Sequence, residues 1–230
     1  MSAIKEHYHH QIEAAKRTKE RPILFTPDMV RAILDGRKTQ TRRIIKHLPA
    51  GVAAIWHDGA GWNVENAAGN TWIGRLTCHY GNPGERLWVR ETWAKQLDGK
   101  IIYRADHENW QLADYTTTGA WRPSITGAWR PSIHMPRAAS RITLQITHIR
   151  AQRLHDITEA DAIAEGLHFT VPNSGPNTYY DNYHTGRWLD PEMLNNPIAS
   201  YHTLWEKING PNSWQQNPWV WAITFKPITP

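Results

Sequence analysis

The feature that most limits the fold of this chain is the shortness of the segments that carry a regular hydrophobic pattern. Between residues 141 and 154 apolar and polar side chains alternate, and Ile142, Leu144 and Ile146 share one face, as in a half-buried strand. The same alternation returns over residues 219–225. Predicted strands outnumber predicted helices, and no regular strand–helix alternation favours a parallel sheet. The pattern therefore predicts an α+β chain that is mainly β, a small and mostly antiparallel barrel with short peripheral helices.

Three helices are predicted from their start and stop signals. In the first, Thr26 can cap the N-terminus, Pro27 suits the first position and Gly36 follows the end. A second is expected over residues 158–166, where a threonine cap precedes an acidic residue at capping-box spacing and a glycine closes the helix. A third is expected over residues 201–210 from the spacing of its apolar side chains.

The length and composition fit one globular domain. The chain has 230 residues, of which 40% are hydrophobic, enough for a substantial core. Residues 1–21 are expected to be a polar extension, and residues 22–230 a single domain. Gly-, Asn- and Pro-rich stretches predict insertions near 50–84, 105–135 and 168–198, the first of them bearing a hairpin. An exact octapeptide duplication, 118–125 and 126–133, lies in one insertion and is assigned no chemistry.

Composition excludes several classes of protein. No apolar run approaches the ~18 residues of a membrane helix, and the N-terminal segment lacks the apolar core of a signal peptide. The single cysteine, Cys78, cannot form an internal disulfide or a zinc cluster. The 13 histidines show no metal-binding spacing, so neither metal nor cofactor is expected. We expect a cytoplasmic protein, a monomer, whose net charge of +5 mildly favours an anionic partner.

Tryptophan is over-represented among the aromatic residues, with 13 Trp against 3 Phe. Large aromatic side chains dominate cores and can also stack on flat ligands. Trp219 and Trp221 belong to a predicted strand and are read as architecture. The rings that stay as candidates to line a pocket for a flat base are Trp62, Trp72, Trp88, Trp110 and Trp188.

Chemistry is concentrated in the polar stretch 36–43, which leaves the first helix and runs into a predicted strand. No esterase, P-loop or dinucleotide motif occurs elsewhere. In an extended segment Lys38, Gln40 and Arg42 share one face, whereas Thr41 lies on the other. The stretch is either a solvated basic strand or a site in which Lys38 serves as base to the hydroxyl of Thr41. The second reading needs burial or a nearby cation to lower the pKa of the lysine.

These residues resemble a known family. Residues 36–43, directly after a short helix, resemble the signature of ASCH domains, which are small barrels related to the PUA fold. Residues 83–89 resemble the family's polar strand, with Glu85 in place of the more usual Asp. Residues 157–166 resemble its helix, and residues 219–225 resemble its terminal strand. The whole chain is similar to longer ASCH-like proteins of phages and prophages.

The resemblance implies an activity and three catalytic residues. Small bacterial ASCH proteins of this type include amidohydrolases that remove the acetyl group from N4-acetylcytidine. Carried over by motif, their catalytic residues correspond to Lys38, Thr41 and Glu165. In this interpretation Lys38 activates Thr41 or a water, and Glu165 assists proton transfer to the leaving amine. The expected substrate is a nucleoside or base, contacted by Trp88, Arg42 and Tyr103.

Two other functions stay open. PUA-like barrels commonly bind RNA, a partner that suits the positive charge, and a ribonuclease activity lies between binding and hydrolysis. The candidate phosphate contacts are Arg42, Arg43, Arg86 and Arg90. A phage accessory protein whose insertions bind another protein is the third interpretation.

Overall fold

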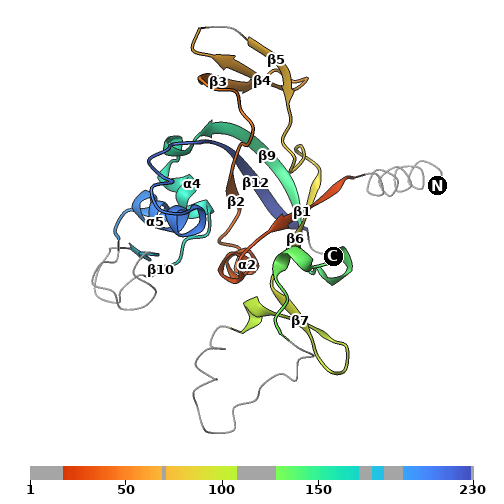
Figure 1. Cartoon of the computed structure of the whole chain (residues 1–230). Helices are drawn as coiled ribbons and strands as arrows, with labels where there is room; N and C mark the ends of the chain where they lie inside the picture. Colours follow the sequence, from red (N-terminus) through yellow and green to blue (C-terminus); the bar gives the residue numbers. More distant parts are fainter. Residues whose placement is uncertain (1–17, 69–70, 108–127, 171–177, 184–193, 229–230) are drawn as a thin grey trace, which may run out of the picture. The chain divides into compact units, whose positions relative to one another are not determined.

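The computed structural model describes residues 18–68, 71–107, 128–170, 178–183 and 194–228. Within these segments are twelve strands and three α-helices (Figure 1), so the mainly β prediction is confirmed, whereas the closed barrel stays a prediction. The chain divides into two compact units. Unit 1 comprises residues 1–26, 79–147 and 226–230, and unit 2 comprises residues 27–78 and 148–225. The predicted single domain, 22–230, stays a prediction, and most of the N-terminal extension lies outside the described residues.

Unit 1 is built on short strands. Strand β1 (Glu20–Leu24) pairs in parallel with β6 (Arg86–Arg90), which pairs in antiparallel fashion with the start of β9 (Thr143–Arg153). A hairpin joins β7 (Trp93–Lys95) to β8 (Ile101–Tyr103). The strands predicted over 86–91, 100–104 and 141–154 are therefore confirmed. The described part of the unit also contains three single-turn 3-10 helices: η1 (Arg104–Asp106), η2 (Ser132–His134) and η3 (Arg137–Ala139).

A buried carboxylate lies within unit 1. Glu91 is 1% exposed, and its two oxygens accept hydrogen bonds from Nε and Nη2 of Arg141 at 3.0 and 3.1 Å. Arg141 also pairs with Asp106 and lies 4.0 Å from the ring centroid of Tyr103. Burial raises the pKa of Glu91, and the Arg141 guanidinium opposes that rise. A single arginine thus compensates one buried and one half-exposed carboxylate.

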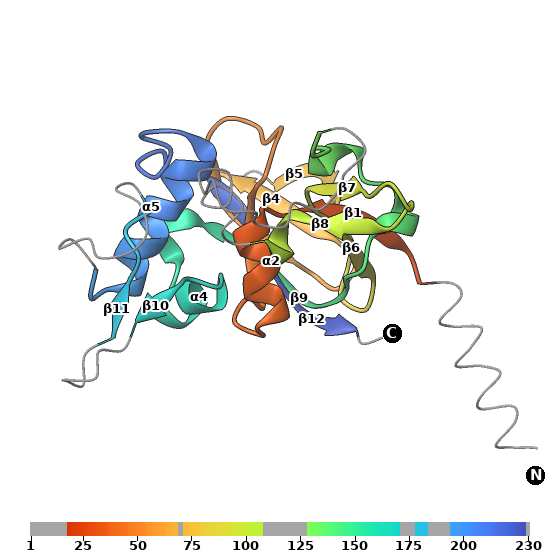
Figure 2. The ribbon, with the colours of Figure 1, turned by 90° about the horizontal axis from the view of Figure 1, so that it is seen from below.

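Unit 2 packs three helices with strands. Helix α2 (Pro27–Leu34) begins at the predicted proline and is followed by Gly36 with φ of +74°. Strand β2 (Gln40–Ile44) follows and pairs antiparallel with β12 (Trp219–Ile228). The short turn η4 (Leu154–Asp156) leads into α4 (Glu159–Ala164), which lies beside α5 (Pro197–Asn209) in Figures 1 and 2.

The helices match their sequence signals with small differences. Thr158 Oγ1 accepts from the N–H of Asp161 at 3.1 Å, as the capping pattern predicts. In α5, Tyr201 and Trp205 are buried, but Ile208, which the apolar spacing assigned to the same face, is exposed. Leu34 of α2 is exposed as well. Because both lie in the last turn of their helices, the packed surface ends before the apolar pattern does. None of the helices in the described segments is long and apolar enough to span a membrane.

The first insertion is a small sheet of its own. Strands β3 (Val52–His57), β4 (Trp62–Asn66) and β5 (Thr71–Leu76) pair antiparallel in that order, which confirms the predicted hairpin. The ring of Trp62 meets that of Trp221 edge-on, with centroids 4.8 Å apart. Of the other insertions, the structure describes the hairpin β10 (Phe169–Thr170) with β11 (Tyr179–Tyr180) and the end of the octapeptide repeat. Residues 108–127, 171–177 and 184–193 lie outside the described residues.

Candidate active site

A glycine brings the end of α4 against the segment that enters β2. Lys38 and Glu165 form an isolated antiparallel bridge, and the N–H of Thr39 donates to Ala164 O at 2.9 Å. Gly166 has φ of +83°, and an added Cβ there would lie 2.6 Å from the Cβ of Lys38. Carbon atoms pack at ~3.5–4.0 Å, so any larger side chain would separate the two segments. Glycine is therefore needed here for both its conformation and its size.

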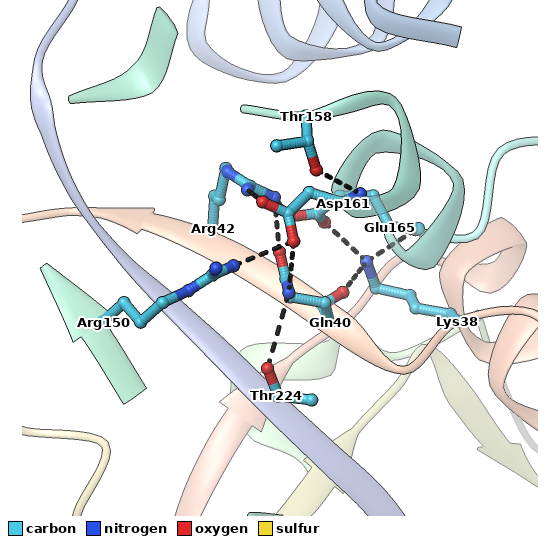
Figure 3. Close-up of polar contacts among 8 residues, drawn as sticks. All are labelled: Lys38, Gln40, Arg42, Arg150, Thr158, Asp161, Glu165 and Thr224. Carbon is cyan, nitrogen blue, oxygen red and sulfur yellow. Dashed lines mark hydrogen bonds and ion pairs between the residues drawn. The ribbon is translucent and has the colours of Figure 1, made fainter. Parts of the chain in front are cut away.

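The amine of Lys38 is buried against oxygen atoms. Its Nζ donates to Glu165 Oε2 at 2.9 Å, to Glu165 O at 2.8 Å and to Gln40 O at 2.9 Å (Figure 3). An ammonium has three N–H donors, so these oxygens fit the protonated form. Burial nevertheless lowers the pKa of Lys38, and although the Glu165 carboxylate opposes this, the net shift is downward. The lysine therefore gives up its proton more readily than an ordinary lysine does.

Glu165 is held from two further directions. Its Oε1 accepts from Nη1 of Arg42 at 3.0 Å, and its negative charge acts on the buried hydroxyl of Tyr201. Burial, followed by the negative charge of Glu165, raises the pKa of Tyr201 well above its ordinary value. The phenol therefore stays protonated. Helix α5 thus reaches the site through a side chain that is otherwise part of the apolar core around Trp205.

Asp161 links helix α4 to side chains of strands β2 and β9. Its Oδ1 accepts from Gln40 Nε2 at 3.1 Å and from Arg150 Nη2 at 2.8 Å, and its Oδ2 accepts from Arg42 Nη2 at 2.9 Å. Burial alone would raise the pKa of this carboxyl, but the hydrogen bonds from Arg150 and Gln40 and the charge of Arg42 outweigh burial and lower it. Asp161 is therefore an ionised link between two arginines.

Together these groups form a chain of alternating charge that runs from the interior to solvent. The exposed fractions of the side chains are 0% for Lys38, 4% for Glu165, 0% for Arg42, 13% for Asp161 and 40% for Arg150. The chain carries two carboxylates and, with Lys38 protonated, three cations. Loss of the Lys38 proton balances the charges, which is consistent with the lowered pKa of the lysine.

The described hydrogen bonds join Lys38 to Glu165 but do not include the hydroxyl of Thr41. Thr41 is buried and pairs with Ile223 across β2 and β12. Alternation along β2 turns its side chain away from the face of Gln40 and Arg42. The carbonyl of Gln40 that accepts from Lys38 Nζ belongs to the peptide unit that leads into Thr41. The catalytic role of Thr41 therefore stays a prediction.

The predicted substrate-binding residues are divided between the units. Trp88 and Tyr103 lie in unit 1, and Arg42 lies in unit 2. The ring of Trp88 is 5.5 Å from the Arg90 guanidinium carbon, and Tyr103 donates its hydroxyl to Ala139 O at 3.0 Å. The roles of Trp88 and Tyr103 in binding stay predictions.

All four candidate phosphate contacts interact with the protein itself, and Arg43 is one of them. Arg42 is fully buried between two carboxylates. Arg86 lies 3.8 Å from a carboxylate oxygen of Glu20, and Nε of Arg90 donates to Ser132 O at 3.1 Å. RNA as a partner stays a prediction. Of Arg42, Arg86 and Arg90, only Arg86 and Arg90 are partly exposed and could contact a phosphate.

The candidate pocket tryptophans have different surroundings. Trp62 packs on Trp221 and His57, so its ring belongs to the contact between the β3–β5 sheet and the rest of unit 2. Trp110 and Trp188 lie outside the described residues, and of Trp72 the structure gives only the backbone pairing with Val64.

Four members of the cluster were not predicted as site residues: Gln40, Arg150, Asp161 and Tyr201. The shared face of Lys38, Gln40 and Arg42 was a signal for Gln40. Asp161 was assigned only to the helix cap, a role that it also fulfils. Tyr201 and Arg150 gave no local signal, because one matches an apolar helix pattern and the other a polar strand position.

The described residues contain no group of three or more His, Cys, Asp or Glu that could hold a metal ion. Comparison with family models, curated proteins and solved structures found no match for this chain.

Proposed function

We propose that this chain is an amidohydrolase that removes acyl groups from N4-acylated cytosine nucleosides or bases, converting N4-acetylcytidine and water into cytidine and acetate. The observation that supports it most is the 2.9 Å contact between Lys38 Nζ and Glu165 Oε2, in a fully buried position where the pKa of the lysine is lowered. This pairs a group able to accept a proton with a carboxylate able to pass one on.

The proposed reaction uses these two residues in sequence. Lys38 in its neutral form takes a proton from the attacking oxygen, which belongs either to water or to the hydroxyl of Thr41. The oxygen adds to the acyl carbon, and the resulting oxyanion accepts from Lys38, now an ammonium. The bond between the acyl carbon and N4 then breaks, while Glu165 relays the proton from Lys38 to N4, and the lysine returns to its neutral form. With Thr41 as nucleophile, a water hydrolyses the acyl-enzyme in a second step.

Arg42 and Tyr201 act in this proposal as positioning residues. Arg42 binds the Glu165 carboxylate, the buried phenol of Tyr201 interacts with it electrostatically, and neither is placed against the scissile bond. Their interactions fix the carboxylate beside Lys38, and an orientation held in advance contributes to catalysis. The fold that we propose to carry this site is the PUA-like barrel of ASCH domains, acting as a cofactor-free cytoplasmic monomer.

The test is an ultraviolet assay of N4-acetylcytidine cleavage. Wild type is expected to turn over, and Lys38→Ala is expected to lose at least about 100-fold in kcat, the scale of one general base. Lys46→Ala, which removes an exposed lysine near the same strand, is the matched control and should keep wild-type activity. Undiminished turnover by Lys38→Ala would exclude the proposed site, and no turnover of any N4-acylcytosine by wild type would exclude the proposed activity.

Thr41→Val separates the two nucleophiles. If the hydroxyl attacks, the variant loses its turnover, and an acyl adduct on Thr41 can be trapped in wild type by mass spectrometry. If water attacks, turnover persists and no adduct forms.

A further inference from the structure

Several buried N–H donors in unit 2 have no hydrogen-bond partner among the described residues, and three of them extend from one face of the sheet. These three are Nε of Arg42, Nε of Arg150 and Nε2 of Gln152. Buried polar groups in native proteins are almost always hydrogen-bonded, so these three donors require an acceptor from outside the described side chains. Arg42 as a whole is 4% exposed, which makes its Nε a fixed feature of the interior.

The three donors lie on one face of the sheet. Arg42 and Arg150 both bind Asp161, so their side chains lie on the same side. Gln152 follows Arg150 by two residues along β9 and therefore shares its face. The terminal nitrogens of both arginines are turned toward Asp161 (Figure 3), which leaves the Nε edges free of that carboxylate.

The strand between them presents a small side chain. Arg42 on β2 pairs with Ala222 on β12. The end of β9 meets the start of β12 where Leu154 N–H donates to Pro218 O at 3.0 Å, and Figure 1 shows the two strands running in opposite directions. Counting back along an antiparallel pair brings Arg150 level with Ala222. The two arginines therefore flank an alanine, and Gln152 lies two residues beyond Arg150 along β9.

The chemistry of the donors selects the ligand. In the orientation that the structure gives to the Gln152 amide, the three unpartnered atoms are donors, so the ligand that they fit presents acceptors. The base of an N4-acylated cytosine has two adjacent acceptors, the ring nitrogen N3 and the carbonyl oxygen O2, and acylation of N4 leaves both in place. In uracil the ring nitrogen N3 carries a hydrogen and would face these groups donor to donor.

We propose that Arg42, Arg150 and Gln152 bind the N3–O2 edge of cytosine, with Gln152 as the residue that determines specificity for cytosine over uracil. This inference rests on the proposed function for the identity of the ligand. The position of these three residues agrees with that assignment, because Arg42 also binds Glu165, which lies beside Lys38. The side chain of Arg150 is 40% exposed, so one end of this group of residues lies at the surface.

The test measures binding of the product rather than hydrolysis. Cytidine and uridine are titrated calorimetrically into the full chain. Cytidine is expected to bind about tenfold more tightly than uridine, because one matched hydrogen bond replaces a donor–donor contact. Gln152→Leu keeps the approximate size of the side chain and should weaken cytidine binding by about five- to tenfold. Gln152→Glu offers the arginines acceptor oxygens of its own and should weaken cytidine binding further.

Gln145→Leu, at a half-buried glutamine of the same strand, is the matched control and should bind cytidine as wild type does. Circular dichroism establishes that each variant is folded. Cytidine binding that is absent in wild type or unchanged in Gln152→Leu would overturn the inference, as would binding of inorganic phosphate in place of cytidine. Binding that depends on Gln152 without hydrolysis of N4-acetylcytidine would sustain the inference and reject the proposed activity. Hydrolysis that depends on Lys38, together with unchanged cytidine binding by Gln152→Leu, would support the proposed activity and overturn the inference.

Discussion

Gly166 and Lys38 are in such close contact that a Cβ added to the glycine would lie 2.6 Å from the Cβ of the lysine. The contact fixes the end of α4 against the entrance to β2. It explains why a residue of the helix end and a residue before the strand, 127 positions apart, meet in one buried ion pair.

Substitution of Gly166 should therefore displace Lys38 as well as strain the local backbone. We expect Gly166→Ala to lower the free energy of unfolding by about 3 kcal/mol or more, from a strained φ and from the displacement of Lys38. Gly59→Ala is the control, since Gly59 has φ of +91° but nothing within 4 Å of an added Cβ, and it should cost only about 1 kcal/mol. Urea denaturation measures both. Equal losses would mean that the contact with Lys38 contributes nothing.

The ion pair between Lys38 and Glu165 should show strong energetic coupling. We expect Lys38→Met and Glu165→Gln each to lower the free energy of unfolding by about 3 kcal/mol. Glu165→Gln removes the counter-charge of Lys38, and Lys38→Met removes the donor to Glu165 Oε2 and to two buried carbonyl groups. The double variant should cost about 1–3 kcal/mol less than the sum. The matched pair Arg31 and Asp28, which is more exposed, should show much weaker coupling in the same double-mutant cycle. Additive losses at Lys38 and Glu165 would contradict the pairing.

Stability should rise with pH on account of Lys38. The folded state lowers the pKa of this lysine from 10.5, so between the lowered value and 10.5 the unfolded chain binds more protons than the folded one. The contribution of Lys38 to the free energy of unfolding must then increase with pH across this window. Urea denaturation of wild type and Lys38→Met between about pH 8 and about pH 10 tests it, and the wild type should gain relative to the variant. A difference that is flat or falls with pH would show that the pKa is not lowered.

The buried carboxylate of unit 1 should depend on its single arginine. We expect Arg141→Leu to lower the free energy of unfolding by about 3 kcal/mol, because Glu91, 1% exposed, loses the guanidinium that binds both of its oxygens. Arg137→Leu removes a more exposed arginine paired with Glu20 and should cost about 0.5 kcal/mol. Thermal denaturation compares the two variants. A loss in Arg141→Leu no larger than in the control would mean that Glu91 is compensated by other groups.

Local signals in the sequence predicted much of the fold. The cap at Thr158, the proline at position 27 and the alternation at the start of β9 each depend on neighbouring residues, and the structure confirms each of them. The ends of the packed helix faces could not be predicted, because exposure of Leu34 and Ile208 depends on where the neighbouring elements stop.

The site was predictable only in part for the same reason. Lys38 and Glu165 were paired through a family resemblance, and the structure brings them into contact. Tyr201 and Arg150 reach the cluster from elements distant in sequence, and a phenol on an apolar helix face carries no sign that its hydroxyl will lie near a carboxylate. Such partners follow from the packing of α5 and β9, which composition and periodicity do not determine.

Helix α4 has six residues, fewer than a helix needs to persist by itself in water. Its helical state depends on the anchors at its two ends, the Asp161 links to the arginines and the Glu165 link to Lys38. The helix and the contact between Lys38 and Glu165 consequently form or dissolve as one cooperative unit. Hydrogen exchange at the amides of this single turn and a half thus reports the fraction of molecules in which the proposed site is assembled.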